Sequence, residues 1–382
     1  MVVAARHAFS RALGARAEGV IIGGKSGAIQ RNFFAKLEDL DLHQYVRATA
    51  HNAGDGAINF FIRDDYARDW MANSDTTQLA NTLKLDPAND PDDLEREILL
   101  SMLAGPRPFI FPNFEEFNAA VRIRCNIVGA ARRTQLAFHT VEAERPADFW
   151  TYSEEGGFTI LPGKPLIEAL EKATQPKIYD KLYSFSCYRA TEYVILLGIA
   201  QELQTVNPLL LERLQTQWET RAIMSGKFHD VFLYEYGSLN DPLPLRYYVP
   251  GDRVWFRNPD ERSSNISGYE GSWVFYLGSG LFSNFWKRNQ PYTFTKKCVE
   301  IFHWRNSTYL DATNELRMNE TVVEKQVRDS LQDPEQLGEI LRKMERFRDP
   351  HGVYAEGGCI DASREFARYV CTGTADIVLP GL

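Results

Sequence analysis

Cysteine is scarce in this sequence and never forms a closely spaced pair. Only five cysteines are spread over the 382 residues, at Cys125, Cys187, Cys298, Cys359 and Cys371. A disulfide framework uses an even, compact set of cysteines, and a structural zinc site needs clustered ligands. The pattern argues against both, and it predicts a reduced compartment, which we expect to be the cytoplasm. We also expect no bound metal and no cofactor.

A net positive charge and long apolar runs are lacking too. The formal net charge is -8, which argues against DNA binding through an overall positive field and leaves open a local basic patch for an RNA partner. No apolar run approaches the length of a membrane span, so we expect no contact with a membrane. What is present is an ordinary globular composition, with 44% hydrophobic and 25% charged residues, which is sufficient for a large core.

The pattern divides the chain into four stretches. We expect an N-terminal tail, a helical and loop addition, a core and a C-terminal helical region, with the bounds 1–30, 31–112, 113–310 and 311–382. No linker rich in proline, glycine or serine separates these stretches. The addition is therefore expected to wrap around the core rather than to form a separate domain. The oligomeric state is not predicted.

Hydrophobic periodicity predicts helices first and antiparallel strands afterwards. Helical spacing runs through 95–103, 114–136, 166–173 and 190–203, and the last of these is apolar on all sides, as buried central helices are. Alternating patterns then predict strands at 231–236, 245–249, 253–256, 273–277, 281–282 and 298–303. A charged amphipathic pattern returns over 320–347. This order predicts an α+β fold in which a buried helix that begins at a cysteine is followed by a sheet.

Cys187 stands at the predicted start of the buried helix. The unpaired backbone amides and the dipole at a helix N-terminus favour an anion, which increases the thiolate fraction of a cysteine there. Thiol acyl-transfer enzymes place their nucleophile in this way, with a base on a facing sheet. The alternative is an inert, buried structural cysteine, which is the commoner case.

The segments around Cys187 resemble those of a known enzyme family. Arg124-Cys-Asn-Ile-Val128, Tyr183-Ser-Phe-Ser-Cys187 and Gly251-Asp252 resemble, in order and spacing, motifs of the bacterial spore-coat protein-glutamine gamma-glutamyltransferase (transglutaminase) family. The resemblance covers roughly residues 117–286. It implies a papain-like or transglutaminase-like core, with the nucleophile helix packed on an antiparallel sheet and helical additions at both ends. It also implies thioester chemistry at Cys187.

The sequence departs from the family at the partners of the nucleophile. The resemblance places the family's two catalytic glutamates at Ser186 and Ser272 and its catalytic histidine at or near Phe285. Without a histidine, a thiol loses general-base help that is worth roughly 100- to 10,000-fold. Glu270 is our best replacement candidate, because it shares a strand face with Ser272, and Asn284 is a candidate for orienting an acyl oxygen. For Glu270, Asn284, His303 and Glu192 alike, a structural or surface role is the alternative.

Acidic residues gather in the N-terminal addition. Asp64, Asp65 and Asp69 lie beside Tyr66 and Trp70, and Arg63 and Arg68 belong to the same stretch. Carboxylates next to aromatic rings are suited to clamp a guanidinium or ammonium group, so these aspartates are candidate substrate-binding residues, together with Ser186, Ser272 and Asn284. The alternative is a solvated helix face with internal ion pairs.

Three functions follow from these observations. The first is an acyltransferase that forms an amide bond through a Cys187 thioester from an activated donor such as aminoacyl-tRNA, as an arginine-containing cyclodipeptide synthase would. It would need a small-molecule or aminoacyl donor and an amine acceptor, with tRNA as one candidate partner. The second is protein crosslinking by a protein-glutamine gamma-glutamyltransferase with a rearranged acid and base. The third is an inactive transglutaminase fold that serves as a binding protein.

Overall fold

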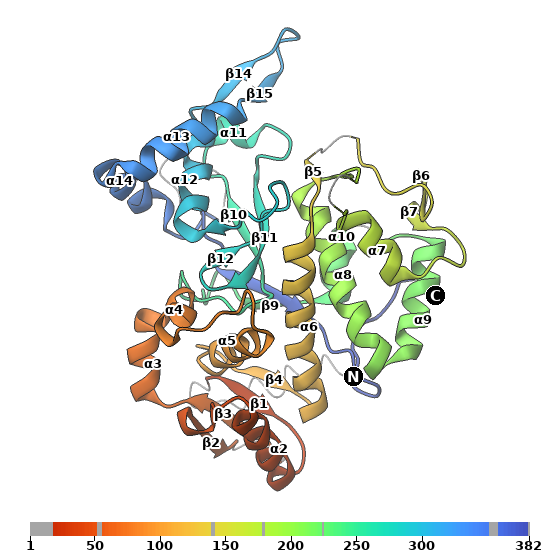
Figure 1. The fold of residues 1–382 in the computed structure, drawn as a ribbon, viewed down its shortest axis with the longest axis vertical. Coiled ribbons are helices and arrows are strands. Elements are labelled where there is room, and N and C mark those ends of the chain that lie inside the picture. The colour runs from red at the N-terminus through yellow and green to blue at the C-terminus, as the bar shows by residue number, and fades with distance from the viewer. Residues whose placement is uncertain are drawn as a thin grey trace.

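The structure is a computed structural model, and it describes residues 18–51, 56–138, 142–177, 180–223, 225–350 and 358–380. Most of the expected N-terminal tail, residues 1–17, lies outside the described residues. Within the described ranges no helix is both long and apolar enough to cross a membrane. The chain combines helices with one large antiparallel sheet and several small sheets (Figure 1). The fold class is therefore α+β, as the sequence pattern predicts.

The N-terminal part contains a sheet that the pattern did not predict. Its strands lie in the order β2-β3-β1-β4, with the bounds Val46–Ala50, Ile58–Ile62, Val20–Ile22 and Phe109–Phe111. The helices around it are α2 (Ser26–Asp39), α3 (Asp64–Trp70), α4 (Leu79–Leu83) and α5 (Pro91–Leu103). The expectation of helices and loops over 31–112 was incomplete, because strands of three to five residues are too short to show a periodicity of their own. β1 also shows that the tail ends before Val20.

A pair of long helices forms the centre of the molecule. α6 (Phe114–Arg133) packs along α8 (Cys187–Val206), and Figure 1 shows the two side by side. Gly198 permits this approach, because a Cβ there would lie 2.7 Å from Cγ1 of Ile127 on α6. Three further helices and two short strand pairs surround α8, with the bounds α7 (Leu166–Thr174), α9 (Pro208–Thr220), α10 (Ser225–Phe232), β5 (Ala137–Phe138), β8 (Ser184–Phe185), β6 (Trp150–Ser153) and β7 (Gly157–Ile160).

The large sheet has six strands and is antiparallel throughout. Its order is β13-β12-β11-β10-β16-β9, with the bounds Tyr292–Thr293, Leu281–Phe282, Gly271–Gly278, Arg253–Arg257, Ser363–Ala367 and Leu233–Gly237. α8 packs against β11, so the nucleophile helix lies on this sheet, as expected. β16 comes from the stretch expected to be a helical addition, yet it pairs with both β9 and β10. The C-terminal stretch is thus part of the core sheet.

Two of the predicted strands are not strands. Residues 245–249 form an irregular segment, in which Thr76 Oγ1 accepts a hydrogen bond from the Tyr248 amide at 2.7 Å. Residues 298–303 belong to the helix α12 (Phe294–Trp304). Its buried positions Phe294, Cys298, Ile301 and Trp304 are spaced as a helical stripe, and the prediction of a strand rested on a window too short to separate the two periods.

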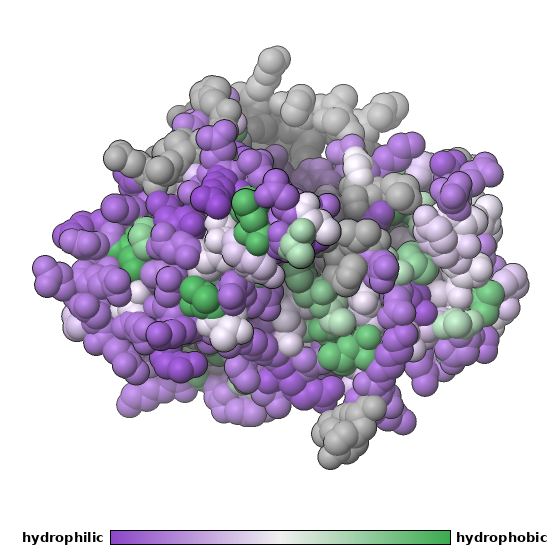
Figure 2. Space-filling view, turned by 90° about the horizontal axis from the view of Figure 1, so that it is seen from above, coloured by the Kyte–Doolittle hydropathy of each residue, from purple (hydrophilic) through white to green (hydrophobic). Residues whose placement is uncertain are grey.

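A second apolar cluster lies on the face of the large sheet that is turned away from α8. α12 packs there on α13 (Glu320–Gln332) and α14 (Pro334–Met344), while the hairpin β14 (Thr308–Leu310) and β15 (Leu316–Met318) projects outward (Figure 1). A short helix, α11 (Glu261–Ser264), precedes β11. The main cluster surrounds α6 and α8. Figure 2 shows a face that is mostly hydrophilic, with a few small groups of apolar side chains, as expected when most apolar residues are gathered into two interior clusters.

Candidate active site around Cys187

Cys187 is the first residue of α8. The residue before it, Ser186, caps the helix, and its Oγ accepts a hydrogen bond from the Arg189 amide at 3.3 Å. The Ser186 side chain is therefore occupied by the backbone of the first helical turn. The cap leaves the thiol at the positive end of the helix dipole, which favours the thiolate.

The strand β11 lies opposite the thiol. Burial raises the pKa of the Cys187 thiol. The backbone N–H groups of Trp273 on β11 and of Tyr188 act in the other direction, because they can donate hydrogen bonds to the sulfur, and so does the positive charge of Lys297. Two amide donors beside a nucleophile are also the groups that stabilise an oxyanion during acyl transfer.

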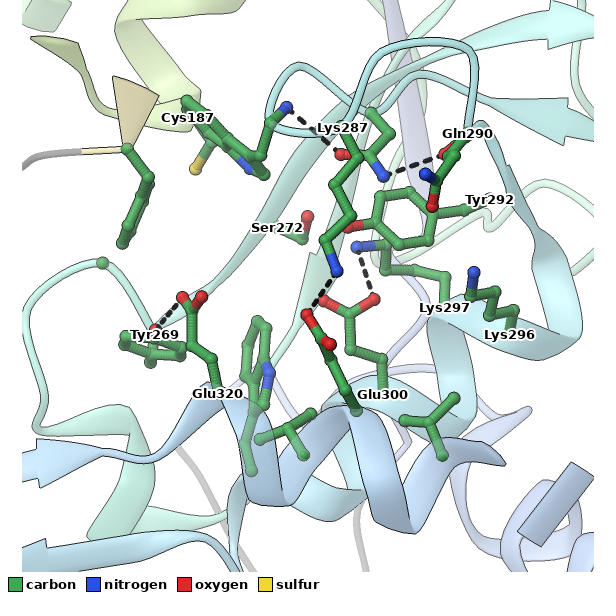
Figure 3. Close-up of a pocket in the computed structure, with 18 of the residues that line it drawn as sticks. Cys187, Tyr269, Ser272, Lys287, Gln290, Tyr292, Lys296, Lys297, Glu300 and Glu320 are labelled. Carbon is green, nitrogen blue, oxygen red and sulfur yellow. Dashed lines mark hydrogen bonds and ion pairs between the residues drawn. The ribbon is translucent and has the colours of Figure 1, made fainter. Parts of the chain in front are cut away.

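A cavity of about 390 Å³ opens beside the thiol. Its wall combines one end of β11, the segment from Asn284 to Gln290, α12 and α13 (Figure 3). The lining carries aromatic and charged side chains, among them Phe138, Tyr269, Trp286, Tyr292, Trp304, Lys287, Lys296, Lys297, Glu300, Glu320, Glu324 and Arg328. The thiol therefore has access to a space of the size that small-molecule sites commonly have.

Lys297 is buried in the wall of this cavity. Its ammonium group lies 3.4 Å from the centre of the Tyr292 ring and 3.3 Å from Oε2 of Glu300. Burial lowers the pKa of Lys297, while the neighbouring carboxylate of Glu300 and a thiolate at Cys187 raise it. Figure 3 shows the ammonium turned toward Glu300, with the Tyr292 ring beside it.

Two further interactions tie the wall together. Lys287 forms an ion pair with Glu324 of α13, and the Tyr269 hydroxyl donates a hydrogen bond of 2.7 Å to Glu320. Both cross from the core sheet or its loops to α13, as Figure 3 shows for Tyr269 and Glu320. The C-terminal helices therefore close one side of the cavity.

The residues predicted to lie near the thiol differ in whether they line the cavity. Ser272 and Asn284 line the cavity. Asn284, however, donates a hydrogen bond of 2.8 Å to the Gln290 carbonyl and so holds the loop between them. Glu270 is exposed, and its carboxylate accepts a hydrogen bond of 3.0 Å from the Gly268 amide. Its negative charge raises the pKa of Cys187. Phe285 is buried in the main apolar cluster.

The acidic cluster of the N-terminal part does not line this cavity. Asp64, Asp65 and Asp69 all lie on α3, which Figure 1 places beside the small N-terminal sheet. Asp65 contacts Arg63 at 3.4 Å across the helix start. The structure therefore brings together Cys187, Ser272 and Asn284, but not these three aspartates. A role for them in binding a substrate stays a prediction, and it would have to concern a second surface.

Lys297 and Glu300 were missed by the sequence reasoning. Both lie on α12, part of which was assigned to a strand, and a strand places them on opposite faces. A helix places them three residues apart on one side. The available signal was the charge of Lys297 within the stripe that includes Ile301 and Trp304. The other candidates are occupied elsewhere, since His303 shares a hydrogen bond of 2.7 Å with Ser330 and Glu192 pairs with Arg189. In the described part of the chain, no group of three or more His, Cys, Asp or Glu residues could hold a metal ion.

Comparison with known proteins identifies the family to which the chain belongs. The family described as protein-glutamine gamma-glutamyltransferase matches residues 71–370. The chain belongs to the protein-glutamine gamma-glutamyltransferase family. Among solved structures, a transglutaminase from Geobacillus stearothermophilus without its C-terminal extension is 21% identical, with a TM-score of 0.38, over 56% of this chain and 98% of that chain. No match was found among curated proteins.

Membership of the gamma-glutamyltransferase family confirms the resemblance carried by the motifs around Cys187. The match extends beyond the expected 117–286 on both sides, to 71–370, and it includes the helices α12 to α14 and the strand β16. The part of the cavity wall that comes from α12 and α13 thus belongs to the region shared with the family. The chain is a transglutaminase-like acyltransferase.

Proposed function

We propose that this protein forms an amide bond by acyl transfer through a thioester on Cys187, from an activated acyl donor to a primary amine. The observation that carries the proposal is the thiol itself. It stands at the N-terminus of α8, within reach of two backbone amides, and it lines a cavity large enough for a small acyl group. The donor class that we put first is a carboxyl ester, of which aminoacyl-tRNA is the biological example.

Each step uses groups that lie beside the thiol. The Cys187 thiolate attacks the carbonyl carbon of the donor, and we assign the stabilisation of the negative oxygen that develops to the Trp273 and Tyr188 amides, which can donate hydrogen bonds near the sulfur. The leaving group departs and the acyl group stays on sulfur. A primary amine then attacks the thioester, and the amide product leaves with regeneration of the thiolate.

An ester donor agrees with the side chains around the thiol. The positions where the family has a glutamate and a histidine hold Ser272, which carries no charge, and Phe285, which is buried in the core. An amide donor cannot release its nitrogen without a full proton transfer from an acid, whereas the oxygen of an ester is a better leaving group and needs less help from an acid. Lys296 and Arg328 at the same cavity supply cationic groups for a phosphodiester next to the reacting end.

A second candidate is transfer from a protein glutamine side chain. The family match over residues 71–370 favours it, because the family is defined by that donor. The two candidates share the Cys187 thioester and the amine acceptor. They differ in the donor alone, so a single set of assays separates them.

The test is intact-mass detection of an acyl adduct. Wild-type protein and Cys187→Ala would be incubated with charged arginyl-tRNA, or with a glutamine-bearing protein such as casein, first without and then with a small primary amine. We expect an adduct from aminoacyl-tRNA on the wild type, none on Cys187→Ala, and release of an amide when amine is added. An adduct from casein alone would select the second candidate. No adduct from either donor, with Cys187 inert toward iodoacetamide, would instead support the inactive binding protein.

A further inference from the structure

We infer that Lys297 is the acid and base partner of Cys187, and that it replaces the catalytic glutamate and histidine that the family has and this chain lacks. This inference deepens the proposed function and rests on it. It assigns a catalytic role to a residue on α12 that no motif in the sequence marks, and it specifies which atom gives and takes the proton during acyl transfer.

The burial of Lys297 calls for an explanation. Its side chain is 2% exposed, and burying an ammonium group is costly unless partners compensate the charge. The structure supplies two partners, the Glu300 carboxylate at 3.3 Å and the Tyr292 ring, whose centre is 3.4 Å away. Both hold the ammonium at the cavity wall rather than letting it reach bulk water. A lysine at the surface would avoid this cost of burial and would need no such partners, so the stability of the fold does not explain why Lys297 is buried.

Lys297 and Cys187 share the same cavity and influence each other. Both residues line it, and Figure 3 shows Cys187, Ser272 and Lys297 around one space. The positive charge of Lys297 lowers the pKa of Cys187, and a thiolate at Cys187 raises the pKa of Lys297. These are the mutual effects expected of two opposite charges that face the same cavity once the thiol loses its proton.

Several charged and titratable groups face Lys297 from the elements packed around it. Besides Cys187 at the start of α8 and Tyr292 of β13, they are Glu300 and Lys296 of α12, Lys287 of the preceding loop, and Glu320, Glu324 and Arg328 of α13. Lys287 is engaged with Glu324, and Glu320 with Tyr269. Among the charged groups at the cavity, Lys297 is the buried cation whose charge acts on the thiol.

The proton steps balance with these two residues alone. The reactive form is the Cys187 thiolate with the Lys297 ammonium. As the carbon–sulfur bond forms and the bond to the leaving oxygen breaks, the ammonium gives its proton to that oxygen, which leaves as an alcohol. The neutral Nζ of Lys297 then accepts a proton from the acceptor amine as its nitrogen attacks the thioester. The carbon–nitrogen bond forms, the carbon–sulfur bond breaks, and the thiolate and ammonium are restored.

The experiment compares Lys297→Met, Lys297→Arg and the matched control Lys325→Met. Lys325 is exposed on α13 outside the cavity, so its replacement changes the net charge by the same amount. Two measurements are made on each full-length variant. One is the pH dependence of Cys187 alkylation by iodoacetamide, resolved by peptide mass spectrometry. The other is the rate of Cys187 acylation by the p-nitrophenyl and ethyl esters of one acyl group, since these esters differ in whether the leaving oxygen needs a proton.

The two Lys297 variants should separate charge from proton transfer. Lys297→Met should move the alkylation profile to higher pH, because the thiolate loses a neighbouring cation. Lys297→Arg should keep that profile near the wild type, since a guanidinium keeps the charge but does not release its proton. With the ethyl ester, both variants should acylate on the order of 100-fold more slowly or worse. With the p-nitrophenyl ester the loss should be much smaller.

Other results would overturn the inference. If both Lys297 variants acylate with the ethyl ester as fast as Lys325→Met, Lys297 is not the acid. If both variants slow the two esters equally, with no change in the alkylation profile, its role is structural. Equal far-ultraviolet circular dichroism and melting temperature, within a few degrees of the wild type, establish that each variant is folded. Absence of any acyl adduct on wild-type Cys187 would instead reject the proposed function.

Discussion

The guanidinium of Arg124 on α6 donates a hydrogen bond of 2.7 Å to Asp252 at the entry to β10, and both residues are almost completely buried. The pair joins the central helix pair to the large sheet. Asp252 also accepts a hydrogen bond of 2.7 Å from the Val249 amide, and Arg124 donates to the Pro250 carbonyl. The relative position of α8 and β11, and hence of Cys187 and Trp273, depends on this junction.

Removal of one member of the Arg124–Asp252 pair should therefore destabilise the protein strongly. We expect Arg124→Met to lower the free energy of unfolding by about 3–5 kcal/mol, because Asp252 would remain buried without its counter-ion. Urea denaturation followed by tryptophan fluorescence measures the change. The matched control is Arg317→Met, which breaks an exposed ion pair with Asp311 on the projecting hairpin and should cost less than about 1 kcal/mol. Equal losses in the two variants would refute the importance of the junction.

A second prediction concerns Gly198, where α8 packs closely against α6. In an open helix, Gly→Ala is stabilising by roughly 1 kcal/mol. At Gly198 the added Cβ would meet Cγ1 of Ile127 at 2.7 Å and push α8 away from α6. We expect Gly198→Ala to destabilise the protein by about 1–3 kcal/mol and to slow Cys187 acylation. Gly129→Ala on α6 is the control, because its Cβ would meet the flexible end of Arg133 at 3.4 Å, and it should be neutral or stabilising.

Glu97 should make stability depend on pH in the neutral range. It is fully buried on α5, where burial raises its pKa from 4.5 to about 7, against hydrogen bonds from the Ser279 amide and the Tyr276 hydroxyl. Because the folded state holds this proton more tightly than the unfolded state does, stability falls as the pH rises from about 4.5 through 7. The difference amounts to roughly 3 kcal/mol.

Glu97→Gln should flatten that slope. Melting temperatures between pH 5 and pH 8 would show it, with the exposed Glu335→Gln as control. His229 contributes a slope of the same sign, since its hydrogen bond with Glu365 raises its pKa and that stabilisation is lost as the pH rises through it. The wild type therefore keeps both slopes and Glu97→Gln keeps one. An unchanged profile in Glu97→Gln would show that the carboxyl group is ionised in the folded state at neutral pH.

The elements of the site that could be predicted are those whose pattern lies within one continuous segment of the sequence. A cysteine followed by a long apolar run identifies the start of α8, and alternation identifies β11. The rest depends on tertiary pairing. β16 is five residues long and is separated from its partner β9 by more than a hundred residues, so no local signal shows that it lies between β9 and β10. Lys297 was missed for a related reason, because its helix was too short to establish its period and its charge is compensated only in three dimensions.

The remaining prediction concerns Glu300, which holds the ammonium of Lys297 in place. The carboxylate of Glu300 raises the pKa of Lys297, so Glu300→Gln should lower it and leave a smaller fraction of Lys297 protonated at any given pH. Acylation by the ethyl ester requires transfer of that proton from Lys297 to the leaving oxygen. Its decline at alkaline pH should therefore begin at a lower pH in Glu300→Gln than in the wild type. With the p-nitrophenyl ester, whose leaving group needs no proton, this decline should be much weaker in both proteins.

Stopped-flow rates between pH 6 and pH 10 provide the measurement, and the exposed Glu339→Gln on α14 is the control of equal charge. If the alkaline decline stays in place in Glu300→Gln while the melting temperature falls, Glu300 acts on the packing of α12 and not on the proton of Lys297. A decline that moves to lower pH with the ethyl ester alone would connect the buried pair on α12 to the chemistry at Cys187, because a packing defect would affect the two esters alike.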